Sequence, residues 1–329
     1  MILCGGLGRR SLLTGAATTL CVPAHAATRK PLIELSRQPP NYDSPLEAFA
    51  GPITPNDRFF VRTHESDPAA DPNQPTQLTI DGDAAARPAT LTLDDLRRLP
   101  QQEVVAVCQC LGDRRAAGAM GCAVWRGPRL RDVLAAAGPL PDAVEIIFSG
   151  GSMTDYVRSL PIARALHDDT LVALAMNDAP LPPLHGQPAR LVVPGLSGDS
   201  WVKRLGRIEL RRSGQAATRV RELAVNALAT SHTDGDRVRG SGFTLAGLAW
   251  DSGSGIARVE FSINGGITWG RAMLGPEEGP HAFRPWSTQL SASPGRLRPM
   301  LRAVSRAGVM QAAGAPVDNP IQTLDLVAL

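Results

Sequence analysis

The chain has 329 residues, of which 43% are hydrophobic and 20% charged, and its net charge at neutral pH is +3. This composition supports buried cores and excludes wholesale disorder, and the length is typical of about two domains. The small net charge, spread over scattered arginines, argues against nucleic-acid binding.

The first 26 residues are typical of an export signal. Gly8-Arg9-Arg10 precedes a modest apolar run, residues 12–22, and Ala24-His25-Ala26 then offers the small residues that a signal peptidase reads. The paired arginines favour the twin-arginine route. We therefore expect residues 1–26 to be a twin-arginine signal peptide and the protein to be periplasmic; the alternative is a cytoplasmic protein with a frayed apolar start. No run reaches the about 20 apolar residues of a membrane span, so none is expected.

Residues 27–215 mix short strands with short helices, which predicts an α+β domain. A proline-rich extended arm, residues 27–57, comes first. Helices are predicted at 93–99, where Thr92 offers an N-cap, and at 130–137, which Gly138 ends. Strands are predicted at 59–61, 78–80, 104–107, 144–148, 190–193 and 202–210.

Residues 222–329 have a different sequence pattern. They contain few helix signals, and turn residues separate short segments that are typical of strands. Val259, Phe261 and Ile263 alternate with Glu260 and Ser262, as in a half-buried strand. Other strands are predicted at 245–250, 256–263, 268–274, 286–290 and 298–304. Short strands at this spacing predict an all-β, immunoglobulin-like sandwich.

The cysteines point to one chemical centre. Cys4 and Cys21 lie in the leader, which leaves three, an odd number that argues against a disulfide framework. No Cys-x-x-Cys-His is present, so no covalent haem is expected. A predicted strand leads into Cys108-Gln109-Cys110-Leu111-Gly112-Asp113-Arg114-Arg115. Nearby guanidinium groups favour a thiolate, which can be a soft metal ligand or a nucleophile, whereas a buried structural cysteine is the third possibility.

Several segments around this loop follow a recognisable order. Phe59-Phe60-Val61-Arg62-Thr63-His64 precedes the Cys110 loop. Gly118-Ala119-Met120-Gly121, Trp125-Arg126-Gly127, Met176-Asn177, His185 to Gly195 and Trp201-Val202-Lys203 follow it. This series, from about residue 52 to about 310, resembles the sulfite oxidase family of molybdopterin enzymes. The segment after residue 222 resembles the family's immunoglobulin-like dimerisation domain.

The resemblance implies a set of site residues. Cys110 is the expected protein ligand of molybdenum, and Cys108 is interpreted as packing. Arg62 and Arg115 are expected to face the substrate oxyanion. The residues expected to hold the molybdopterin are Phe60, Val61, Arg62, His64, Cys110, His185, Arg190, Trp201, Val202 and Lys203.

Three departures from the family pattern concern the substrate pocket. Asp113 stands where the family has asparagine, and the link from Arg115 to Gly118 is short. The family's catalytic tyrosine has no counterpart, because Tyr42 and Tyr156 both lie elsewhere. These departures bear on the substrate more than on the cofactor.

The resemblance implies a molybdenum-dependent oxidoreductase that oxidises sulfite to sulfate. Without a haem motif the electrons must pass to a separate acceptor, for which cytochrome c is expected. The alternatives are a reductase of sulfoxides or similar oxo-donors, and a weakly active partner subunit in sulfur oxidation. A homodimer is also implied.

Overall fold

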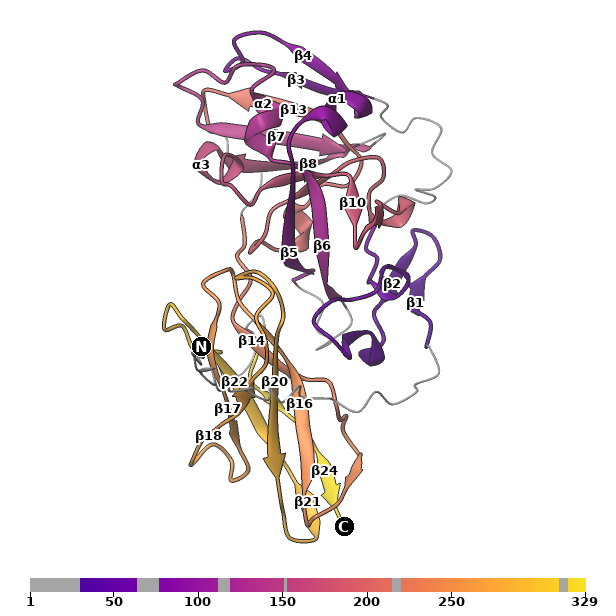
Figure 1. Ribbon diagram of the computed structural model, residues 1–329, viewed down its shortest axis with the longest axis vertical. Helices are drawn as coiled ribbons and strands as arrows, with labels where there is room; N and C mark the ends of the chain where they lie inside the picture. The colour runs from indigo at the N-terminus through magenta and orange to yellow at the C-terminus, as the bar shows by residue number, and fades with distance from the viewer. Residues whose placement is uncertain (1–29, 64–76, 112–118, 151–152, 215–219, 314–318) are drawn as a thin grey trace, which may run out of the picture.

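The computed structural model describes residues 30–63, 77–111, 119–150, 153–214, 220–313 and 319–329. Two units follow one another along the long axis of the molecule (Figure 1). The first unit, residues 30–214, carries β1–β13, and the second unit, residues 220–329, carries β14–β24. Within these ranges no helix is both long and apolar enough to cross a membrane.

The first unit is built mainly from strands. A five-stranded sheet has the order β4-β3-β13-β7-β8, a four-stranded sheet has the order β11-β10-β6-β5, β12 pairs with β9, and β1 pairs with β2. The strands are β1 Ile33–Ser36, β2 Asn41–Asp43, β3 Gln77–Asp81, β4 Ala89–Thr92, β5 Gln101–Gln109, β6 Met120–Pro128, β7 Glu145–Gly150, β8 Met153–Pro161, β9 Leu171–Ala173, β10 Ala175–Met176, β11 Ala179–Pro180, β12 Arg190–Val192 and β13 Leu205–Arg211.

The helices of the first unit are short. The α-helices are α1 Leu93–Arg98, α2 Leu130–Leu134 and α3 Ile162–Ala165, and the 3-10 helices are η1 Leu46–Phe49, η2 Asn56–Arg58, η3 Pro183–His185 and η4 Gly198–Ser200. The predicted cap of α1 is confirmed, because Thr92 and Asp95 form a capping box. The predicted helix at 130–137 is shorter than expected: it ends at Leu134, and the turn that follows closes at Gly138 with φ +63°.

Two predicted strands of the first unit differ from the structure. The strand expected at 202–210 begins only at Leu205, because Arg204 has φ +49°, which interrupts an extended backbone. At 59–61 there is a single bridge between Val61 and Tyr42. Phe59 and Phe60 are both buried there, so this segment lacks the alternation of a half-buried strand.

Among the described residues of the second unit, every regular element is a β-strand. Its sheets have the orders β14-β16-β20-β19, β15-β24-β21 and β18-β17-β22-β23. The strands are β14 Asn226–Ala229, β15 Arg237–Val238, β16 Phe243–Trp250, β17 Ile256–Ser262, β18 Gly270–Arg271, β19 Met273–Leu274, β20 Arg284–Leu290, β21 Gly295–Leu297, β22 Met300–Ser305, β23 Gln322–Thr323 and β24 Leu326–Ala328. The all-β prediction is thus confirmed, and the strand expected at 268–274 is split into β18 and β19.

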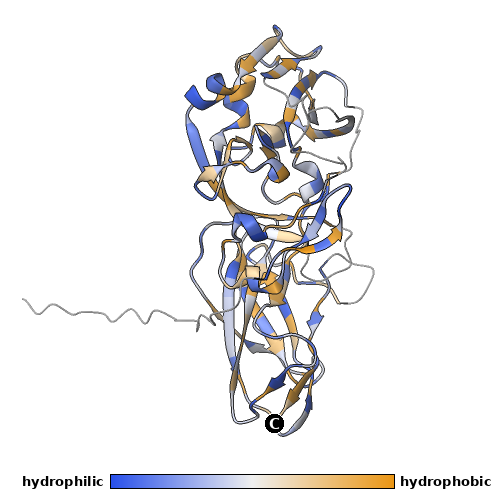
Figure 2. Cartoon of the chain, turned by 90° about the vertical axis from the view of Figure 1, so that its right-hand side faces the viewer, coloured by the Kyte–Doolittle hydropathy of each residue, from blue (hydrophilic) through white to orange (hydrophobic). Residues whose placement is uncertain are grey.

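Each unit has its own buried cluster, and a third cluster joins them. One cluster lies within the first unit and a second within the second unit. The third combines Val107, Met120 and Cys122 of the first unit with Trp250 and Phe283 of the second. Apolar and polar residues intermix along the strands of both units, as the two-sided strand pattern requires (Figure 2).

Candidate active site

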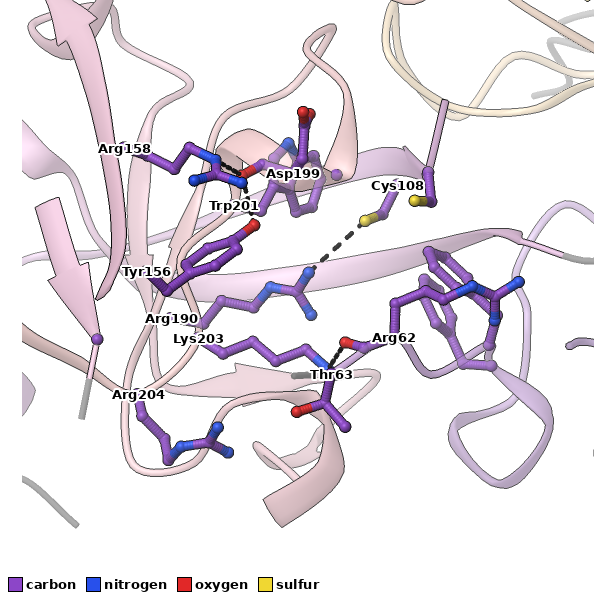
Figure 3. Close-up of a pocket in the computed structure, with 15 residues that line it drawn as sticks. Arg62, Thr63, Cys108, Tyr156, Arg158, Arg190, Asp199, Trp201, Lys203 and Arg204 are labelled. Carbon is purple, nitrogen blue, oxygen red and sulfur yellow. Dashed lines mark hydrogen bonds between the residues drawn. The ribbon is translucent and has the colours of Figure 1, made fainter. Parts of the chain in front are cut away.

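One pocket of the first unit collects most of the predicted site residues. Its empty space, open mouth included, is ≈ 840 Å³. It lies where the end of β5 meets β8 and the segments around η4 and β13. The lining is Phe59, Phe60, Arg62, Thr63, Cys108, Cys110, Gly150, Tyr156, Arg158, Arg190, Gly198, Asp199, Trp201, Lys203 and Arg204 (Figure 3).

Strand β5 delivers both cysteines to this pocket. The pairing of Gln109 with Met120 extends one residue further, because the Cys110 amide donates to the Ala119 carbonyl at 2.9 Å. Residues two apart on a strand share a face, so the thiols of Cys108 and Cys110 point the same way. Cys108 is buried and Cys110 is half-buried. The predicted metal ligand is therefore the more accessible of the two thiols.

Arg190 is the central buried cation of the pocket. Its guanidinium packs against two indole rings that contact each other, 5.1 Å from the centroid of Trp125 and 5.6 Å from that of Trp201. It donates to the His185 carbonyl at 3.1 Å and to the Cys108 sulfur at 3.6 Å. Its Nε is buried and has no hydrogen-bond partner among the described residues. This donor is available to an anion in the pocket.

Lys203 adds a second positive charge beside Arg190. Its ammonium donates to the Leu184 carbonyl at 2.6 Å and to the Arg62 carbonyl at 2.9 Å. In Figure 3 the side chains of Arg190, Lys203 and Arg204 enter the pocket from one side and face Cys108 and Thr63 on the other. Fixed cations in a partly buried pocket favour an anionic ligand.

Arg62 lies at the pocket but its guanidinium turns toward β2. It pairs with Asp43, donates to the Tyr42 carbonyl at 2.9 Å, and lies 5.8 Å from the Phe60 ring. The carboxylate of Asp43 is buried. The role of Arg62 toward a substrate oxyanion stays a prediction, and in this structure its guanidinium is engaged by Asp43.

His185 does not line the pocket but packs against Phe59, which does. The two rings meet edge-on with centroids 5.5 Å apart, and Nε2 of His185 lies 3.3 Å from the Asn56 carbonyl. Burial lowers the pKa of His185 to about 3, and the nearby Lys203 and Arg190 add to this, so its ring is neutral at pH 7.

Two further predicted residues are buried but do not line the pocket, and two cannot be placed. Val202 is fully buried. Val61 exchanges both of its backbone hydrogen bonds with Tyr42. His64 and Arg115 lie outside the described residues.

The sequence reasoning missed a cluster of three residues on the pocket wall. The phenol of Tyr156 donates to the Asp199 carbonyl at 2.8 Å, and Nε of Arg158 donates to the same oxygen at 2.9 Å. The Arg158 guanidinium lies 4.0 Å from the centroid of the Tyr156 ring. These bonds tie β8 to η4. The sequence contains no clear signal for them, because the polar residues of β8 occur in adjacent pairs and do not mark one face of the strand.

The donor set fits a molybdopterin. A half-buried thiol offers a soft ligand for the metal. The buried Nε of Arg190 and the ammonium of Lys203 offer charge-assisted hydrogen bonds to an anionic pterin. The rings of Phe60 and Trp201 supply apolar walls.

Comparison with known proteins supports this assignment. The family model described as the oxidoreductase molybdopterin binding domain matches residues 64–218, and the Mo-co oxidoreductase dimerisation domain matches residues 217–293. The crystal structure of the sulfane dehydrogenase SoxCD from Paracoccus pantotrophus superposes with a TM-score of 0.81 at 24% identity, covering 96% of this chain and 92% of that one. This likeness shows the shared fold.

Curated relatives extend the similarity over most of the chain. The mitochondrial sulfite oxidase of Mus musculus is 34% identical over 88% of this chain and 63% of that protein. That of Homo sapiens is 34% identical over 82% of this chain and 59% of that protein. The chain thus spans about three-fifths of the length of these relatives. With its two matching family models, the chain belongs to the sulfite oxidase family of molybdopterin oxidoreductases.

Proposed function

We propose that this protein is a molybdenum-dependent oxidoreductase that oxidises sulfite to sulfate. The observation that carries the proposal is the half-buried Cys110 thiol at the end of β5, inside a pocket lined by cationic side chains. Mammalian sulfite oxidases are among the relatives of this chain. The reaction adds one oxygen atom from water to sulfite and releases two electrons and two protons.

The residues of the pocket divide between cofactor and substrate. Cys110 would bind the metal, while Arg190, Lys203 and Trp201 would hold the pterin. When bound, the cofactor supplies oxygen-atom transfer and accepts the two electrons. Phe60 and Val61 would support it, with His64, His185 and Val202 as further predicted contacts.

The remaining cations would act on the substrate. Sulfite is a dianion or monoanion at neutral pH and sulfate is a dianion, so guanidinium groups would bind both through charge-assisted hydrogen bonds and stabilise the charge that develops on the oxygen atoms during the reaction. Arg158 and Arg204 reach the same pocket as Cys110, and Arg62 and Arg115 are the substrate arginines predicted from sequence.

We further propose that the electrons leave singly to a separate cytochrome c and that the protein works in the periplasm. Gly8-Arg9-Arg10 supports export by the twin-arginine route with residues 1–26 as the leader. That route carries folded proteins, which suits a chain that takes up a cofactor before export.

The proposed domain plan places the molybdopterin domain at 27–215 and an immunoglobulin-like dimerisation domain at 222–329. Separate apolar clusters in the two units support this division. The matching of residues 217–293 to a dimerisation domain supports a homodimer.

The test is sulfite-dependent reduction of cytochrome c by protein purified with its leader and shown to contain molybdenum. Cys110→Ser should abolish turnover. Cys122→Ala is the matched control, because Cys122 is fully buried and does not line the pocket. Loaded protein that reduces no cytochrome c with sulfite would exclude this activity, and assays with sulfoxides and other sulfur compounds would then distinguish a reductase from a weakly active partner subunit.

A further inference from the structure

Strand β5 presents its two faces to the two units. Ala106 and Cys108 belong to the cluster of the first unit, with Cys110 packed against it. Val107 belongs to the cluster that joins the units, and its amide donates to the His281 carbonyl of the second unit at 2.9 Å. Because side chains alternate along a strand, Gln109 also faces the second unit. The residue directly before the predicted metal ligand is thus in contact with the other unit.

The Gln109 amide is held by two side chains of the second unit. Its Nε2 donates to Oδ1 of Asn319 at 2.7 Å. Its Oε1 accepts from Nε1 of Trp250 at 3.0 Å and from Nδ2 of Asn319 at 3.2 Å. Both lone pairs of the amide oxygen are therefore used. Gln109 is buried, so each of these bonds is costly to break.

These two partners are themselves fixed within the second unit. Trp250, at the end of β16, is buried and packs against Phe283 with ring centroids 5.2 Å apart. Asn319 donates to the Ala224 carbonyl at 3.1 Å, and its own carbonyl accepts from Gln311 at 3.3 Å. Both partners of Gln109 are therefore held by further contacts within the second unit.

The backbone of Gln109 is held from the first unit as well. Its carbonyl accepts from the Ser197 hydroxyl at 3.4 Å, beside η4. A Cβ placed on Gly198 would lie 3.3 Å from the same carbonyl and 2.9 Å from the Cys108 sulfur, so η4 packs closely on this stretch. The peptide that joins Gln109 to Cys110 is thus held from both sides.

We propose that Gln109 is a positioning residue through which the second unit sets the orientation of the Cys110 thiolate at the metal. The inference rests on the proposed function in taking Cys110 as the metal ligand. It gives the second unit a role at the site in addition to dimerisation. The physical basis is that outer-shell hydrogen bonds orient a ligand and tune the metal it binds.

The test compares loaded wild-type protein with Gln109→Met, which keeps the side-chain length and removes the amide. The readouts are the thiolate-to-metal charge-transfer absorption, the midpoint potential of the metal, and the separate kcat and KM for sulfite. We expect the absorption band and the potential to shift and kcat to fall by about tenfold, with KM unchanged, in line with other outer-shell substitutions.

A matched control separates orientation from a loosened interface. Val107→Ala lies on the same face of β5, two residues earlier, and removes an apolar contact with the second unit without touching the amide network. It should lower thermal stability while leaving the band and the potential at their wild-type values. Equal spectral changes in both variants would overturn the proposal.

Trp250→Phe approaches the same contact from the second unit. It removes the Nε1 donor and keeps an aromatic ring against Phe283, so folding and cofactor loading are preserved even if Gln109→Met fails to load. The band should shift in the same direction and by less than in Gln109→Met. Wild-type spectra and potential in Trp250→Phe would refute the proposed role.

The spectrum and the potential also keep this inference separate from the choice of substrate. If the loaded protein does not oxidise sulfite, the proposed activity fails, while the two spectroscopic readouts still decide the role of Gln109. If Cys110→Ser retains the charge-transfer band, Cys110 is not the ligand, and the positioning role falls with it.

Discussion

The guanidinium of Arg190 donates to the sulfur of Cys108 across 3.6 Å, although the two residues lie 82 positions apart in the chain. Burial raises the pKa of the Cys108 thiol to about 11, and the nearby Arg190 only partly offsets this. Cys108 is therefore a neutral thiol at pH 7. It lies two residues before Cys110, which is more accessible. The difference in burial, which the Arg190 contact only partly offsets, therefore separates the two thiols chemically.

Substitution of each cysteine should reveal this difference. Cys108→Ala should retain molybdenum and lower the free energy of unfolding by about 1 kcal/mol, because it removes one buried sulfur. Cys110→Ser should lose the thiolate-to-metal absorption and all turnover. Molybdenum analysis, absorption spectra and urea denaturation of both variants measure this. A Cys108→Ala protein without the absorption band would mean that Cys108 is a ligand.

Arg190→Lys should impair cofactor binding although it retains the positive charge. Lysine cannot lay a planar group against the rings of Trp125 and Trp201, nor present the fork of donors that Arg190 directs at the His185 carbonyl and the pocket. We expect about 1–3 kcal/mol less stability in the cofactor-free protein and a lower molybdopterin content per chain. Arg207→Lys, at a half-exposed position of β13 outside the pocket lining, is the comparison, and an equal loss of molybdopterin in both variants would contradict the prediction.

Tyr156→Phe and Arg158→Gln should each be mild, whereas the double variant should be worse than their sum. The Asp199 carbonyl accepts from both side chains, so either one alone still satisfies it. Each single change should cost about 1 kcal/mol, and losing both leaves a partly buried carbonyl unpaired. A urea-denaturation double-mutant cycle measures the coupling, and simple additivity would show that the shared carbonyl is unimportant.

Stability should fall with pH below about 6.5 because of His185. Burial lowers its pKa to about 3 in the folded protein. Between the unfolded and folded pKa values the unfolded chain binds a proton that the folded chain does not, so stability is present above pH 6.5 and is lost as the pH falls toward 3. The loss between pH 7.5 and pH 5 should be about 2 kcal/mol. His185→Gln should remove this part of the pH dependence, and an unchanged profile would contradict the neutral buried ring.

Asp169 should stabilise the contact between the two units. Burial disfavours its charge, but the hydrogen bonds from His281 at 2.7 Å and from Arg164 outweigh this and hold the pKa of Asp169 well below its usual range. A carboxyl with a depressed folded pKa contributes stability above its unfolded pKa of about 4, and this is lost as the pH falls below that value. Asp169→Asn should lower stability at pH 7 by about 1–3 kcal/mol and flatten the acid limb, as urea denaturation at pH 3–7 will measure. An acid limb as steep as that of wild type would show that another carboxyl dominates.

Local signals in the sequence were sufficient for the family, the all-β character of the second unit and six of the fifteen residues that line the pocket. The capped helix at Thr92, the strand that leads into Cys110 and the segment around Arg190 depend on neighbouring residues, so a linear pattern can reveal them. Order and spacing of motifs survive in a linear sequence, which is why Cys110, Arg190, Trp201 and Lys203 were found and all line one pocket.

Contacts between distant segments were decided by the tertiary structure. Arg62 lines the pocket and its role toward the substrate stays a prediction, but its pairing with Asp43 could not be read from the sequence, because the bridge between Tyr42 and Val61 brings β2 beside it. Tyr156 and Arg158 reach the pocket because β8 pairs with β7 in one register, and a shift of one residue would turn both away. No local pattern encodes such a register.

The contacts of Gln109 were likewise decided by the tertiary structure. In the sequence Gln109 is only a polar residue between two cysteines, and no local pattern indicates what it contacts. Its amide is satisfied by Trp250 and Asn319, residues 141 and 210 positions away in the other unit. The sequence determined which side chains carry the chemistry, since those are properties of residue type. The packing of two units across β5 decided how those side chains are held, because buried hydrogen bonds form only when both partners are brought together in space.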